Sequence, residues 1–152
     1  MMKPWRYAAA VALVLGLAKS PAAGVGATLT LGVGSITFPS ASPVTVSSIA
    51  ANGNPISVSV TTTGNPANWN LTVLANGDLV SGGSTVAIGN VTWTATGTGF
   101  VNGTMSKTTA QTLASGTGNV NLTGTQSYFL ANSWNYVTGS YSQTVVYTLV
   151  AQ

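Results

Sequence analysis

Apolar and polar residues alternate along most of this chain, and a period of two is typical of half-buried β-strands. The alternation is clearest over residues 29–33, 56–60 and 69–73, where Leu, Ile, Val and Trp are separated by Ser, Thr, Asn or Gly. Further strands are expected at residues 44–49, 91–95, 128–130 and 141–150. Residues 28–152 contain no convincing helical period. The pattern therefore predicts an all-β chain.

Clusters of Gly, Asn and Pro separate these segments at short intervals, as expected of turns. Asn76 and Gly77 predict a tight hairpin, because both residues tolerate the positive φ that such a turn requires. Short strands at this spacing predict one antiparallel β-sandwich of about seven to nine strands, of the Ig-like or Greek-key type. No repeat, linker or second domain is visible.

The first residues indicate a secretory leader. Lys3 and Arg6 precede an apolar run of 11 residues, 8–18, which is too short for the about 20 residues that span a membrane. Small residues allow cleavage after Ala23 or Ala27, and an uncleaved anchor is the alternative. We therefore expect a signal-peptide helix in residues 1–27, followed by a β-sandwich domain at 28–152. The domain is expected outside the cell or on its surface, with no membrane contact after cleavage.

Charge is almost absent beyond the leader. Asp78 and Lys107 are the charged residues of 28–152, which contain no His, Cys or Glu. Metal sites lack ligands, and one lysine cannot neutralise a nucleic-acid backbone. We therefore expect no cofactor, no metal, no nucleic-acid partner and no enzyme activity. A surface of Ser, Thr, Asn and Gly suits a protein packed beside copies of itself or held in a wall matrix.

Two residual chemistries need a specific test. Asp78 and Lys107 are a candidate pair for an intramolecular isopeptide bond, which requires a buried carboxyl with a raised pKa beside an uncharged amine. The simpler alternative places both in solvated loops, since Asp is common after turns. Cleavage after Ala27 would also expose Thr28 as an N-terminal nucleophile, but no oxyanion partner or proton relay is visible nearby.

The aromatic residues fall into two groups. The first lies on strand-like segments together with leucines, and burial in a core is its simplest interpretation. The second surrounds a loop rich in Asn, where aromatic faces beside amides are either a platform for sugar rings or a packed corner. The expected core and motif residues are Trp69, Leu71, Trp93, Tyr141, Tyr147 and Leu149, and the candidate sugar-stacking residues are Tyr128, Trp134 and Tyr136.

Two short motifs carry a family resemblance. Trp69-Asn70-Leu71 is a Trp-x-Leu triplet, and Tyr141 is followed by Val-Val-Tyr-Thr-Leu at 145–149. This pattern resembles the WxL domain of Gram-positive surface proteins, and membership would imply non-covalent attachment to peptidoglycan. The closing segment from Gly139 is also similar to the last strand of spore coat protein U and of fimbrial subunit sandwiches.

The two ends of the domain suggest how it assembles. The closing segment is apolar on both faces, which is usual for a strand that is central or covered by a partner. Leu29, Leu31 and Val33 form a candidate assembly strand that either pairs within its own domain or reaches into a neighbour. No charged residue guards these edges.

Together these features predict a non-catalytic, secreted structural protein of the cell surface, a coat or pilin-like fibre subunit that self-associates through β-strand pairing. The alternative is a non-covalent module of WxL type that binds peptidoglycan or another cell-wall polysaccharide.

Overall fold

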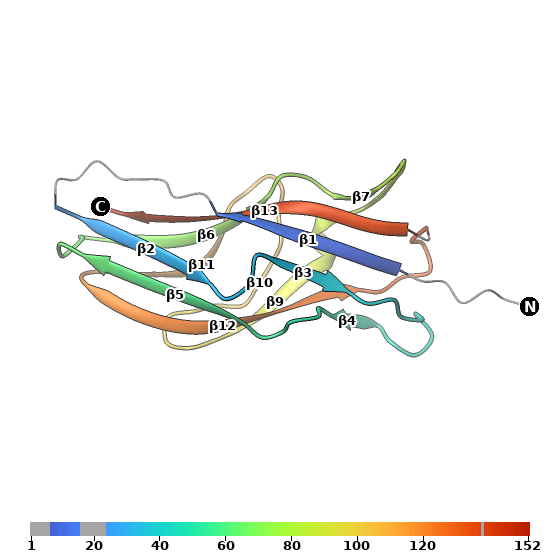
Figure 1. The fold of residues 1–152 in the computed structure, drawn as a ribbon, viewed down its shortest axis with the longest axis horizontal. Coiled ribbons are helices and arrows are strands. Elements are labelled where there is room, and N and C mark those ends of the chain that lie inside the picture. Colours follow the sequence, from blue (N-terminus) through green and yellow to red (C-terminus); the bar gives the residue numbers. More distant parts are fainter. Residues whose placement is uncertain (1–6, 16–23, 138) are drawn as a thin grey trace, which may run out of the picture.

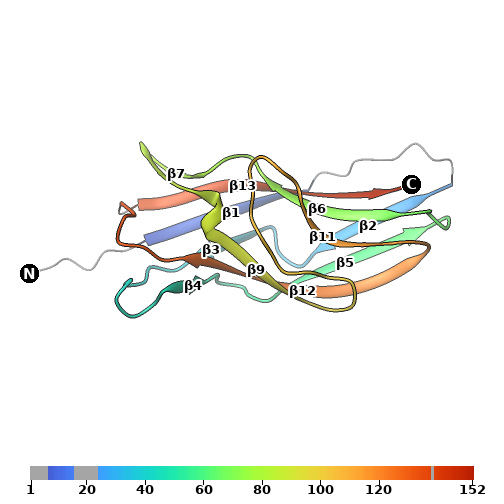
Figure 2. The same ribbon diagram turned by 180° about the vertical axis from the view of Figure 1, so that it is seen from behind.

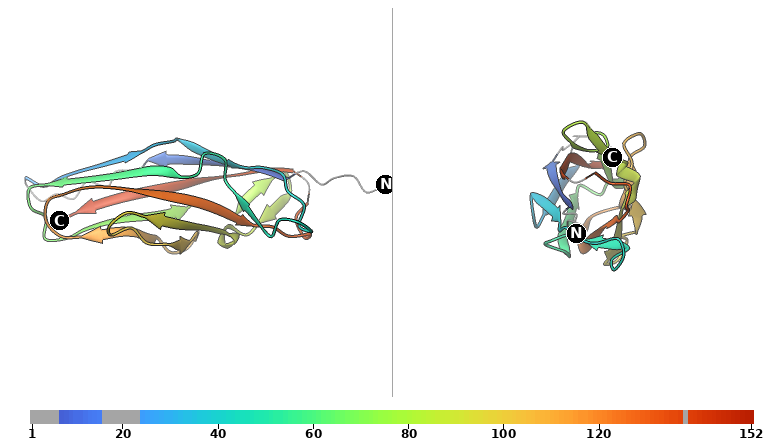
Figure 3. Two further views of the ribbon diagram at one scale, coloured as in Figure 1. Left: turned by 90° about the horizontal axis from the view of Figure 1, so that it is seen from below. Right: turned by 90° about the vertical axis from the view of Figure 1, so that its right-hand side faces the viewer.

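The structure is a computed structural model that describes residues 7–15, 24–137 and 139–152, and for residues 7–15 it defines the path of the backbone. It is all-β: two sheets face each other along the length of an elongated body (Figures 1 and 3). A single turn of 3-10 helix at Ile88–Asn90 is the only helical element of the described residues. The expected all-β class is therefore confirmed.

The first sheet has seven strands. Five follow the order β11-β6-β13-β1-β3, while β7 pairs with β13 and with β8. Their bounds are β1 Tyr7–Leu15, β3 Ser35–Phe38, β6 Trp69–Ala75, β7 Leu79–Ser81, β8 Ser84–Val86, β11 Gln111–Gly116 and β13 Gly139–Ala151.

The second sheet has six strands in the order β10-β9-β12-β5-β2, with β4 paired to β12. Their bounds are β2 Gly26–Leu31, β4 Ser48–Ala50, β5 Ile56–Thr63, β9 Val91–Thr96, β10 Gly103–Thr104 and β12 Val120–Ala131. Several strands are only two to four residues long, so the described residues contain more strands than the seven to nine expected from the alternation.

Strand β13 is central, between β6 on one side and β1 on the other. This is the position expected for a strand that is apolar on both faces. Every pairing between strands is antiparallel except that of β1 with β13, which is parallel.

The core lies between the sheets and is built from alternate residues of each strand. In β5, for example, Ile56, Val58 and Val60 point inward and are at most 1% exposed, while Ser57 points to solvent. Burial of such side chains is the dominant favourable contribution to folding, at about 25 cal/mol for each Å² of apolar surface removed from water.

Two local expectations were wrong. Residues 44–49 were expected to be one strand, but only Ser48–Ala50 is extended, as β4. The backbone N–H groups of Thr45 and Val46 both donate to the carbonyl of Ser42, at 3.1 and 2.9 Å, and so close a turn after Pro43. Val44 is consequently 74% exposed.

Asn76 and Gly77 do not form a hairpin. Strands β6 and β7 on either side of them both pair with β13 rather than with each other, so the chain only bends here. The tight hairpin lies a few residues later, where Gly82 and Gly83 join β7 to β8 and Gly82 has a φ of 57°.

The helix expected in the leader is not seen. Residues 1–6 and 16–23 are outside the described residues, and Tyr7–Leu15 form strand β1. An extended chain at this place completes two backbone ladders at once, one with β13 and one with β3, which a helix cannot do.

Candidate functional site

The feature that distinguishes this sandwich is a slot between β3 and β13, filled by β1 (Figure 1). All nine residues of β1 pair with β13 in parallel, from Tyr7 opposite Gly139 to Leu15 opposite Tyr147. On its other side β1 pairs antiparallel with β3, from Ala9 opposite Phe38 to Ala12 opposite Ser35. We call this place the β3–β13 slot.

Strand β1, inside the slot, supplies backbone hydrogen-bond partners to both walls, β3 and β13. Among the described strands, β1 is the one with which β3 forms a ladder, and a single bridge from Thr37 to Asn52 ties β3 to the rest of the chain. On β13, residues 139–147 have β1 as their neighbour on that side. Without β1, two edges would present unpaired N–H and C=O groups, which are templates for another strand.

On the side that faces the core, apolar and buried residues flank the slot. Ile36 and Phe38 of β3 are 2% and 1% exposed, and Tyr141 and Val145 of β13 are 3% and 1% exposed. A small cavity lies near Phe38 and Tyr141, with room for about one water molecule. Its lining is Phe38, Pro39, Ile49, Leu79, Val86, Leu130, Tyr136 and Tyr141. This cavity is too small for an organic ligand, and the slot beside it is occupied by the polypeptide strand β1.

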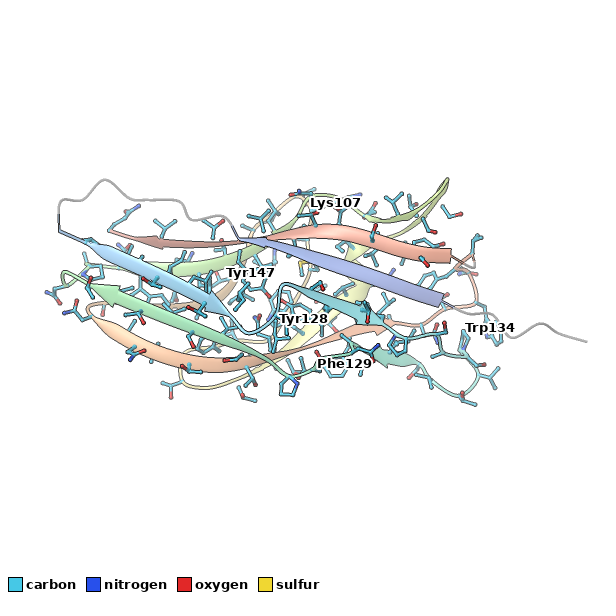
Figure 4. The ribbon with its side chains drawn as sticks, in the orientation of Figure 1. Lys107, Tyr128, Phe129, Trp134 and Tyr147 are labelled. Carbon is cyan, nitrogen blue, oxygen red and sulfur yellow. The ribbon has the colours of Figure 1, made fainter. Side chains whose placement is uncertain are left out.

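A buried hydrogen-bonded cluster ties β13 to the opposite sheet. The hydroxyls of Tyr128 on β12 and Tyr147 on β13 hydrogen bond to each other in the interior (Figure 4). Tyr147 also donates to Oε1 of Gln126 at 2.8 Å, and the Tyr128 hydroxyl lies 3.2 Å from the same oxygen. Burial raises the pKa of both tyrosines. These hydrogen bonds connect β12 of the second sheet to β13 of the first.

Asp78 and Lys107 meet at the surface. Lys107 Nζ lies 2.5 Å from Asp78 Oδ2, and Asp78 Oδ1 accepts a hydrogen bond from the backbone N–H of Ile88 at 3.0 Å. The hydrogen bond from Lys107 holds the pKa of Asp78 below its usual value, followed by the bond from Ile88. An isopeptide bond needs the opposite, a buried and protonated carboxyl. The geometry favours a surface ion pair.

This ion pair should contribute little to stability. We expect Lys107→Gln to lower the free energy of unfolding by less than about 1 kcal/mol, because the two side chains are 46% and 26% exposed. A carboxyl with a lowered folded pKa stabilises above its unfolded pKa, and this contribution is lost as the pH falls through the folded pKa. Melting curves of the parent and of Lys107→Gln should therefore converge below about pH 4. An intact mass lower by one water would instead reveal an isopeptide bond.

The candidate sugar-stacking residues do not form one platform. Tyr128 is 2% exposed in the core, whereas Trp134 is 59% exposed in the loop between β12 and β13, at the end of the molecule far from the C-terminus (Figure 4). Tyr136 is half-buried, and its hydroxyl donates to the carbonyl of Ala131 at 2.7 Å. Asn132 holds this loop to the β3–β4 loop by donating to the carbonyls of Ala41 and Val46 at 3.2 and 2.9 Å.

The expected motif residues are all buried between the sheets. Trp69, Leu71, Trp93, Tyr141, Tyr147 and Leu149 are between 0% and 3% exposed. A Trp-x-Leu triplet on β6 thus faces the interior rather than a ligand, with Asn70 between the two apolar residues pointing to solvent.

The candidate assembly strand lies in the chain's own sandwich. Leu29 and Leu31 belong to β2, which pairs antiparallel with β5, and Leu29 is 5% exposed. Val33 is partly buried in the short connection through which the chain passes from one sheet to the other. Deleting this segment would therefore remove part of the core.

The slot itself was missed from the sequence. Its walls on β3, Ile36 and Phe38, lie in a four-residue strand with only two apolar residues, which gives a weak periodic signal. One sequence signal was available: in the leader, the larger residues Val11, Leu13 and Leu15 alternate with alanines at 8, 10 and 12 and with Val14. That is the period of a strand rather than of a helix.

Other chemistries find no support in the described part of the chain. It contains no group of three or more His, Cys, Asp or Glu side chains that would hold a metal ion. It also contains no helix of the length and hydrophobicity needed to cross a membrane. No protein-family model matches the chain, and no curated protein is significantly similar to it.

Proposed function

We propose that this chain is a secreted, non-catalytic structural protein of the cell surface, a subunit of a coat or fibre that assembles through β-strand pairing. The fold we propose is an Ig-like sandwich of Greek-key type. The observation that carries the proposal is the β3–β13 slot, in which the sheet is completed by a segment that the sequence predicts to be cleaved.

Removal of that segment would create an acceptor for a strand of another chain. Residues 139–147 of β13 would lose their backbone partner on one side, β3 would keep only the bridge from Thr37 to Asn52, and buried residues such as Phe38 and Tyr141 would become accessible. A strand added from another chain would restore the backbone hydrogen bonds and would cover these side chains again. Its main-chain hydrogen bonds supply affinity, and its alternate side chains fill the gap. The near absence of charge leaves nothing to oppose the approach of a second copy.

The second candidate function is a module that binds peptidoglycan or another polysaccharide. Its support is Trp134, an exposed indole beside Asn135 and Ser133 in a loop at one end of the sandwich. Exposed aromatic faces next to amides are suited to sugar rings. This support is the weaker of the two, because Tyr128 and Tyr136 do not present their rings alongside it.

Assembly of the exported protein tests the proposal. We expect the secreted chain, starting at Gly24 or Thr28, to form filaments or stable oligomers in negative-stain microscopy and size-exclusion chromatography. Trp134→Ala should assemble equally well, since the Trp134 side chain is 59% exposed in the loop before β13 and belongs to none of the strands that form the slot. A secreted protein that stays monomeric at high concentration, and binds purified wall material through Trp134, would replace the structural function with the binding module.

A further inference from the structure

We propose that the β3–β13 slot is a binding site for an extended apolar peptide running parallel to β13, and that residues 7–15 of the chain's own leader are such a ligand. The leader would then cap the slot until it is removed. This inference rests on the proposed function in one respect: the capped slot is the surface through which we propose that copies assemble.

The backbone geometry defines the ligand. It must be extended, because it forms ladders on both sides, and its direction is set by nine parallel pairs with β13 and four antiparallel pairs with β3. A chain of opposite direction would form the other type of ladder on each side, with a different spacing of hydrogen bonds. The slot therefore has a polarity as well as a length.

The register also defines which positions of the ligand matter. Val11 lies opposite Ile36, which is 2% exposed, and Leu13 lies opposite Val145, which is 1% exposed. Ala10 lies between exposed residues, Thr37 on β3 and Ser142 on β13. Because paired residues of neighbouring strands share a face of the sheet, apolar residues are required at alternate positions only.

The leader matches these requirements over residues 10–13 and at Leu15. Its larger residues stand at positions 11, 13 and 15, and positions 8, 10 and 12 are alanine, while Ala9 and Val14 depart from the alternation. Export requires a leader with a run of about 7 to 15 apolar residues in length, but it does not require that large and small residues alternate within this run. The alternation is what a strand in this slot requires.

Cysteine pairing in the uncleaved chain tests the register directly. The full chain has no cysteine, so a single pair can be introduced. Ala10 and Thr37 are paired across β1 and β3, and cysteines at these two positions should form an intramolecular disulfide on mild oxidation. Cysteines at Ala10 and Ser35 are the matched control, since Ser35 is displaced by two residues, about 7 Å along the strand. Equal cross-linking of the two pairs, or none in either, would overturn the proposal.

A charge scan of the same full chain gives an independent readout. Val11→Asp should lower the Tm by at least about 5 °C, because position 11 pairs with the buried Ile36. Ala10→Asp, next to Thr37 and Ser142, should leave the Tm within about 2 °C. Equal effects of the two substitutions would show that the leader does not occupy the slot in this register.

Peptide exchange tests the side-chain pattern of the ligand. The full chain is produced without export, with a protease site placed within residues 16–23, and is cut after folding. The leader fragment should co-elute with the remainder, and a fluorescent peptide of residues 7–15, the forward peptide, should replace it. A control peptide of the same composition, in which Ala10 and Val11 are exchanged and Ala12 and Leu13 are exchanged, places its larger residues at the other alternate positions and should bind at least tenfold more weakly. Equal binding of both peptides, or separation of the fragment on cutting, would overturn the proposal.

The outcomes separate this inference from the proposed function. If the forward peptide binds but the exported protein never assembles, the slot is a peptide site and the fibre function fails. If the exported protein assembles while the Ala10 and Thr37 cysteines do not pair, the leader is not the cap and the fibre function stands.

Discussion

As the pH rises above about 10 we expect the protein to lose stability steadily, because two buried tyrosines resist ionisation in the folded state. Burial raises the folded-state pKa of Tyr128 and of Tyr147. A tyrosine with a raised folded pKa contributes its full stability below its unfolded pKa of about 10 and loses it as the pH rises above that value. Each of the two tyrosines should therefore cost about 1.4 kcal/mol for every pH unit.

Urea titrations between pH 7 and pH 12 measure this effect, and Tyr147→Phe is its control. The variant loses one titrating group, so its free energy of unfolding should fall about half as steeply with pH, although it is less stable at pH 7 because Gln126 loses a hydrogen-bond donor. Parallel pH profiles for the parent and for Tyr147→Phe would contradict the assignment of alkaline unfolding to the buried cluster.

Trp93→Ala and Trp69→Ala should each destabilise the protein by about 3–5 kcal/mol through lost burial and a residual cavity. Both indoles are 2% exposed. Each stands directly opposite a glycine on a short or edge strand, Gly103 of β10 for Trp93 and Gly116 of β11 for Trp69. A Cβ at either glycine would collide with the indole, so the ring occupies the space that a side chain would fill.

The two tryptophans should respond differently to a smaller change. Trp93 Nε1 donates to the carbonyl of Val101 at 2.9 Å, whereas Trp69 Nε1 is buried without a hydrogen-bond acceptor. Trp93→Phe should therefore cost more than Trp69→Phe, because only the former removes a hydrogen bond. Trp134→Ala, at a residue 59% exposed, should change stability by no more than about 0.5 kcal/mol. Urea denaturation that ranks the three tryptophans otherwise would contradict this placement.

Strong periodic segments were predictable from sequence, and weak ones were not. Trp69–Ala75 and Ile56–Thr63 are strands because their alternate residues match one buried face over several positions. Gln111–Gly116 is also a strand of the first sheet, β11. Its buried apolar residues are only Leu113 and Ala114, which gives a weak apolar pattern. Its position in the sheet is therefore determined by pairing with β6. At Val44 the alternation predicts a strand that does not form, because local hydrogen bonds to Ser42 close a turn there.

The slot was not predictable because no local signal indicates which strands form its walls. Its two walls, β3 and β13, are separated by about a hundred residues, and the strand between them lies in a segment whose hydrophobicity predicts a secretory leader instead of a strand. Parallel pairing of β1 with β13 depends on contacts at opposite ends of the chain. Sequence patterns indicate which face of a strand is buried, but they do not indicate which strand is its neighbour.

Strands β11 and β9 lie on the side of the sandwich away from β1 and the slot (Figure 2). There, Trp69 and Trp93 lie against Gly116 and Gly103, the glycines of the edge strands β11 and β10, and no residue of β1 pairs with these strands. Asp78 and Lys107 pair with each other and leave no net charge on the side chains of residues 28–152. In the assembly that we propose, ionic strength would therefore have little effect on association. The timing of that assembly would instead be set by an irreversible event, the proposed cleavage behind residues 7–15.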